Sequence, residues 1–143
     1  MYVSIDSRLV GVAITIFILI LTIKSEILED RMIVMQLIMA IPLLMGAMIS
    51  NARIVDEDSF RQYYLFSRIS NSIGTAFIYN TFGLLVTKYV FPMAGLIYFV
   101  LLSAVLLLLM MTQFNHRKLY NEVVMIIVVF ILGILPALGV LPI

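Results

Sequence analysis

Residues 70–88 read SNSIGTAFIYNTFGLLVTK, a segment of membrane-spanning length that carries amides, hydroxyls and glycines among its apolar residues. A helix turns by 100° per residue, and on that spacing its small and polar residues fall within one sector. This polar stripe consists of Ser72, Ala76, Tyr79, Asn80, Gly83 and Thr87. Because the hydrocarbon of a bilayer offers polar groups no hydrogen-bond partner, we expect the stripe to face protein or water instead of lipid.

The composition of the whole chain also indicates a membrane protein. Hydrophobic residues make up 64% of the 143 residues and charged residues 12%, against about a half and a quarter in soluble proteins. A soluble domain of this length could not bury so much apolar surface. The apolar runs are continuous, whereas the strands of a membrane β-barrel alternate apolar and polar residues. The sequence therefore predicts an all-α integral membrane protein.

Four segments carry no charge over about 18 residues or more and a fifth comes close, so we predict one domain, a bundle of five transmembrane helices. The predicted spans cover residues 3–23, 32–49, 70–87, 90–112 and 123–141. No small-x-small cleavage site follows the first run, which favours a retained span over a signal peptide. The glycines and prolines between Gly133 and Pro142 are expected to loosen the last turns of the fifth span.

Residues 59–68 combine aromatic side chains with arginines, a composition typical of a helix at the level of the lipid headgroups. We expect an interfacial helix here that runs into the third span. Basic residues are more frequent on one predicted side of the membrane, with Arg8, Arg53, Arg61, Arg68, Arg117 and Lys118 against Lys24, Arg31 and Lys88. The positive-inside rule then predicts a cytoplasmic N-terminus and an outer C-terminus in the cell membrane.

Ionisable residues are absent from the central part of every predicted span. Membrane enzymes and ion-coupled carriers usually hold such groups within their spans, because the chemistry or the ion binding offsets their desolvation. The chain has no cysteine, and His116 is its only histidine, which excludes cysteine-ligated metals and haem held by two histidines. We predict no cofactor. The net charge of +1 gives no electrostatic reason to expect nucleic-acid binding.

An acidic run, Asp56, Glu57 and Asp58, is the one candidate metal site in the sequence. Adjacent carboxylates can hold a hard cation and, together with His116, could act on a lipid-linked substrate at the cytoplasmic face. The simpler interpretation is a solvated turn whose carboxylates cap the start of a helix, and the sequence favours it.

Four basic residues are candidates for contact with anionic lipid headgroups, since such clusters at the cytoplasmic surface attract negative lipids. They are Arg61, Arg68, Arg117 and Lys118. The alternative is ordinary positive-inside anchoring without a specific lipid. Membrane lipids are expected partners in either case.

The polar stripe of the third span has two interpretations. As a packing face, its small residues let backbones approach and Asn80 hydrogen-bonds across helices. As the lining of a route, its hydroxyls and its amide replace the hydration of a neutral or weakly polar solute. Packing is favoured because the second span carries a matching small and polar face. That face consists of Gln36, Ala40, Leu43, Ala47 and Ser50.

These patterns lead to three hypotheses about function. The favoured one is a non-catalytic helix-packing component of a homo-oligomer or of a membrane complex with other subunits. The alternative is a small oligomeric transporter or channel for a neutral or weakly polar solute, lined by the third span. The least favoured is an enzyme that acts on lipid-linked substrates at the cytoplasmic face.

Overall fold

In the computed structural model the described residues are 29–52, 60–112 and 116–140, with positions 11, 12, 14–16, 18, 19 and 22. They are helical except for short turns, and no strand occurs among them. In chain order the helices are α2 (Arg31–Ala52), α3 (Phe60–Tyr89), α4 (Pro92–Thr112), α5 (His116–Val129), the π-helix η2 (Phe130–Ile134) and α6 (Leu135–Ala137). The all-α prediction is confirmed for these residues, whereas most of the predicted span 3–23 lies outside them.

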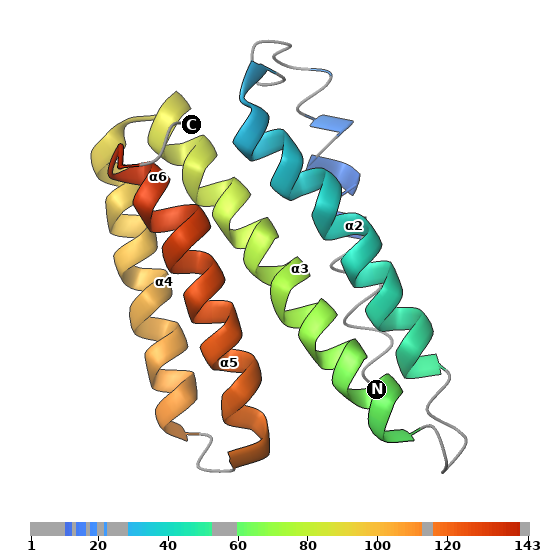
Figure 1. The fold of residues 1–143 in the computed structure, drawn as a ribbon. Helices are drawn as coiled ribbons and strands as arrows, with labels where there is room; N and C mark the ends of the chain where they lie inside the picture. Colours follow the sequence, from blue (N-terminus) through green and yellow to red (C-terminus); the bar gives the residue numbers. More distant parts are fainter. Residues whose placement is uncertain are drawn as a thin grey trace.

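Helix α3 is the centre of the bundle. Figure 1 shows α2 along one side of α3, and α4 and α5 along the other. Among the described elements α2 approaches only α3 closely, whereas α3 also contacts α4, α5, η2 and α6. Among the described helices, α2 is therefore connected to α4 and α5 through α3.

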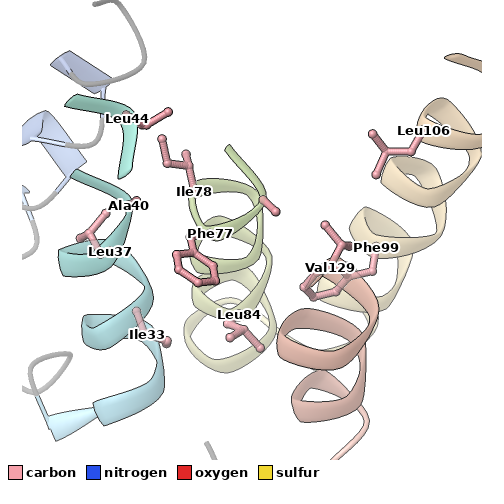
Figure 2. Close-up of a cluster of buried hydrophobic side chains, with 11 residues drawn as sticks. Ile33, Leu37, Ala40, Leu44, Phe77, Ile78, Leu84, Phe99, Leu106 and Val129 are labelled. Carbon is pink, nitrogen blue, oxygen red and sulfur yellow. The ribbon is translucent and has the colours of Figure 1, made fainter. Parts of the chain in front are cut away.

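The apolar core lies on the two faces of α3. Figure 2 shows Phe77, Ile78 and Leu84 of α3 between two groups of apolar side chains. Ile33, Leu37, Ala40 and Leu44 come from α2, and Phe99, Leu106 and Val129 come from α4 and α5. The face predicted for α2 is confirmed in most of its members, because Gln36, Ala40, Ala47 and Ser50 are buried and Leu43 is half-buried.

Glycines let α4 approach α3 closely. A Cβ atom added at Gly83 would lie 2.8 Å from Cε2 of Phe99, and one added at Gly95 would lie 2.6 Å from Cβ of Thr87. The Thr87 hydroxyl also donates a hydrogen bond of 2.8 Å to the Gly83 carbonyl, within its own helix. These contacts are the close backbone approach that small residues permit.

The predicted continuation of the segment 59–68 into residues 70–87 is confirmed from Phe60 onward. Both segments belong to one helix, α3, because no proline or glycine pair interrupts the run from Phe60. The tight connection between the third and fourth spans is confirmed, but it lies at Val90 and Phe91, two residues later than predicted. Pro92 is the first residue of α4, where its missing N–H costs nothing.

Two of the described helices, α2 and α4, are long and apolar enough to cross a membrane. The count of five predicted spans is not supported by this criterion. In α3 the polar stripe lowers the hydropathy, and the apolar helix Val123–Ala137 is shorter than a full span.

We predict that Gly95→Ala destabilises the protein. The new methyl group would overlap Thr87 and force α3 and α4 apart, at a cost of about 1–3 kcal/mol in the free energy of unfolding. Denaturant unfolding of the purified protein measures this change. Ala104→Leu adds bulk at an exposed position of the same helix and is the control. Equal stability of Gly95→Ala and the wild type would contradict the close approach of the two helices.

Candidate functional site

The polar stripe of α3 faces the interior of the bundle. Ala76, Asn80, Gly83 and Thr87 are buried, and the two other residues of the stripe, Ser72 and Tyr79, are half-buried. The backbone carbonyl of Tyr79 accepts a hydrogen bond of 3.2 Å from the Tyr98 hydroxyl of α4. The residues that the sequence assigns to one stripe therefore share one protein-facing side of the helix.

Asn80 connects α3 to the last helical segment. Its Nδ2 atom donates a hydrogen bond of 3.2 Å to the carbonyl of Val128, in the last turn of α5. Its Oδ1 atom lies against Gly133 of η2, where an added Cβ would overlap it. A Cβ at Gly133 would also lie 2.7 Å from Cε1 of Phe99. Position 133 therefore has to be a glycine for Asn80 to reach this turn.

The π-helix η2 follows from Pro136. Proline has no N–H, so the carbonyl four residues earlier, that of Leu132, loses its α-helical donor. The helix widens here, and the N–H of Leu135 donates to the carbonyl of Phe130, five residues back. The loosening predicted for the fifth span thus takes the form of a π-turn, a feature that often occurs at functional sites.

Gln36 of α2 supplies the donor that Pro136 lacks. Its Nε2 atom donates a hydrogen bond of 2.9 Å to the Leu132 carbonyl. The backbone of α2 does not approach η2 closely, and the long side chain of Gln36 spans the distance between the two elements. Gln36 is 4% exposed, and a carbonyl left without a donor at this depth would be costly.

Gln36 and Asn80 both reach the backbone of α5 and η2, at Val128, Leu132 and Gly133. We call these residues, together with Thr81, which follows Asn80 directly in the chain and is also buried, the amide junction. Three of its side-chain oxygens are buried and have no hydrogen-bond partner in the described part of the chain. They are Gln36 Oε1, Asn80 Oδ1 and Thr81 Oγ1. The junction contains no acid or base, so it can donate and accept hydrogen bonds but cannot exchange protons at neutral pH.

A second polar cluster closes the end of the bundle where α2 starts and α3 ends. The carboxylate of Asp30 is buried and accepts hydrogen bonds from the Lys88 ammonium and the Tyr89 hydroxyl. Lys88 also forms an ion pair with it, while its own side chain stays 40% exposed. We call this cluster the Asp30 clamp, and it ties the start of α2 to the end of α3.

The predicted charged sites are only partly within the described residues. Asp56, Glu57 and Asp58 lie outside them, as do the side chains of Arg117, Lys118 and His116. Arg61 is exposed, and the Arg68 guanidinium lies 4.7 Å from the centre of the Tyr64 ring. Among the described residues no group of three His, Cys, Asp or Glu side chains could hold a metal ion.

Sequence reasoning missed parts of both clusters. It counted Lys88 as a loop charge and did not select Asp30 or Thr81. It placed Gln36 on the polar face of α2 without a partner. Pro136 was the available signal, because a proline inside a buried helix implies a carbonyl that needs another donor. The sequence gives no indication that this donor comes from a residue almost a hundred positions earlier.

Comparison of the chain with protein-family models, with curated proteins and with solved structures finds no match.

We predict that Gln36→Leu destabilises the protein only while Pro136 is present. With the proline, the change leaves the Leu132 carbonyl buried without a donor, at a cost of about 1–3 kcal/mol. In a Pro136→Ala background, the alanine N–H can donate to Leu132, and the same change should cost much less. A double-mutant cycle of unfolding free energies measures the difference. Equal costs in the two backgrounds would contradict the assigned role of Gln36.

Proposed function

We propose that this chain is an integral membrane protein of five transmembrane helices with no catalytic role. It acts as a helix-packing component of a homo-oligomer or of a larger membrane complex. The observation that carries the proposal is the combination of buried polar contacts between the helices with an apolar exterior.

The outer surface of α4 is the strongest support for a membrane location. Only 17% of its most apolar 18-residue window is buried within the chain, and only 33% of the corresponding window of α2. The core helix of a soluble protein would be mostly buried. Large side chains such as Val100, Leu108 and Met111 are 62–69% exposed. Acyl chains can cover such a surface, whereas water would make its exposure very costly.

Helix α3 has the length that a span requires. At 1.5 Å per residue, its 30 residues extend about 45 Å, more than the roughly 30 Å of hydrocarbon. The continuous run of α5, η2 and α6 extends about 33 Å, of which the apolar part, Val123–Ala137, makes up about 22 Å. The low hydropathy of α3 is compatible with a span, because Asn80 and Thr87 hydrogen-bond within the protein.

The contacts of the polar stripe favour packing over a solute route. Asn80 reaches the backbone of α5, Gly83 lies against Phe99, and Thr87 lies against Gly95. Residues occupied by neighbouring helices do not line a route for a solute. Association with other chains would then use the apolar outer faces of α2 and α4, through van der Waals packing.

The first turns of α3 suit the headgroup layer on the cytoplasmic side. Arg61 and Arg68 are seven residues apart and therefore lie on one face of the helix, with Tyr64 between them. Arginines and tyrosines at a helix end are typical of the membrane interface. We include anionic lipid headgroups as ligands of Arg61 and Arg68 in the proposal, with the N-terminus in the cytoplasm.

We predict the accessibility of single cysteines, which the cysteine-free chain allows to be placed one at a time. A membrane-impermeant maleimide should label Glu29→Cys in intact cells and Arg61→Cys only after the membrane is permeabilised. Val105→Cys, on the exposed face of α4, should react only after the membrane is dissolved in detergent. The unmodified chain is the control. Rapid labelling of Val105→Cys in intact membranes would exclude a transmembrane α4.

We predict that native mass spectrometry from mild detergent finds more than one copy of the 16.2 kDa chain or a stoichiometric partner. A partner-free monomer would contradict the subunit role without affecting the membrane location.

The same measurement tests lipid binding. Bound anionic lipid should decrease in the double variant Arg61→Gln, Arg68→Gln, because the attraction of the lipid is about 1 kcal/mol per basic residue. Arg31→Gln, which removes an exposed charge at the opposite end of the bundle, is the matched control.

A further inference from the structure

Three oxygen atoms of the amide junction are buried without a hydrogen-bond partner among the described residues. They are Gln36 Oε1, Asn80 Oδ1 and Thr81 Oγ1. Gln36 is 4% exposed, and Asn80 and Thr81 are fully buried. Native proteins leave few such groups unpaired, because each one costs the free energy of its lost hydration. Two of the three side chains come from consecutive residues of α3, and the third comes from α2, the helix packed against it.

The three side chains lie at one level of the bundle. Helices α2 and α3 run antiparallel, with Asp30 beside Lys88. Six residues further along α2, Gln36 is therefore level with Phe82, next to Thr81. Thr81 follows Asn80 directly and lies 100° around the helix from it. On the side of η2, the two amides reach the neighbouring residues 132 and 133.

The orientation of both amides is fixed by the backbone of α5 and η2. Val128 and Leu132 present carbonyl oxygens, which accept hydrogen bonds, so each amide must turn its NH₂ group toward them. A flipped amide would place two acceptor oxygens in contact. Gln36 Oε1 and Asn80 Oδ1 are therefore the atoms left over, and both can only accept a hydrogen bond. The Thr81 hydroxyl can donate one.

The electrostatics of the site favour a neutral ligand. The amide junction contains no carboxylate, and the nearest described carboxylate along α2, that of Asp30, is already paired with Lys88. At 1.5 Å per residue it lies about 9 Å away along the helix. A cation bound at the junction would have no counter-charge in a region of low dielectric, which is strongly unfavourable.

We propose that the amide junction binds one neutral molecule of the size of water. Such a ligand donates one hydrogen to Gln36 Oε1 and one to Asn80 Oδ1, and accepts the hydrogen of the Thr81 hydroxyl. Water has this set of two donors and an acceptor, and buried waters typically make two to four such bonds. The bound molecule would join α2, α3 and the π-turn of η2 into one hydrogen-bonded unit.

The sign of the effect of Thr81→Val tests the proposal in solution. If the hydroxyl donates to a bound molecule, valine removes that bond and lowers the folding equilibrium constant about two- to tenfold. If the hydroxyl is merely buried and unpaired, valine relieves its desolvation and raises the constant. Thr81→Ser keeps the hydroxyl and loses only a methyl group, so it separates the two roles. An unchanged or raised constant for Thr81→Val overturns the proposal.

A crystal structure in lipid, at a resolution that shows ordered water, tests the ligand directly. We expect one peak within about 2.7–3.2 Å of both Gln36 Oε1 and Asn80 Oδ1, without anomalous signal after a thallium(I) soak. An anomalous peak would identify a monovalent cation instead and overturn the neutral ligand. Direct pairing of the two amides with each other, and no peak, would overturn the site itself. Neither outcome affects the subunit role or the membrane location.

Discussion

The hydrogen bond from Gln36 to the Leu132 carbonyl is the interaction on which the polar interior depends. Pro136 has no N–H to donate to the Leu132 carbonyl as in an α-helix, and the helix forms a π-turn at this point. The turn brings Gly133 against Asn80, so the amide of α3 meets the same backbone as the amide of α2. Where Pro136 leaves the Leu132 carbonyl without an N–H donor, side chains of α2 and α3 therefore reach neighbouring residues of η2.

Helix α3 makes this arrangement possible because its faces differ. Toward α4 it presents Gly83 and Thr87, which allow close approach. Toward α5 it presents the Asn80 amide, and apolar residues such as Phe77 and Ile78 extend the core toward α2, as Figure 2 shows. The Asp30 clamp then fixes the end of α3 to the start of α2. The central helix therefore sets the position of every neighbour it touches.

Polar contacts inside and apolar side chains outside are the arrangement that a membrane location requires. In hydrocarbon every backbone and side-chain polar group needs a partner within the protein, and apolar surface costs nothing. The carbonyl freed by Pro136 and the exposed face of α4 meet these two conditions. The amide junction consists of neutral groups, which agrees with the proposed helix-packing role.

The sequence alone predicted the helical class, the stripe from Ser72 to Thr87, the packing face of α2 and the loosened last turns of the fifth span. They follow from residue spacing and backbone chemistry, which are local. The continuation of the segment before residue 70 into the third span was also predicted, and α3 runs without a break from Phe60. The pairs Gln36 with Leu132 and Asp30 with Lys88 were decided only by the tertiary structure. Pro136 indicates that the Leu132 carbonyl needs another donor, because proline has no N–H. Which side chain supplies that donor is determined only by the packing of helices that are distant in sequence.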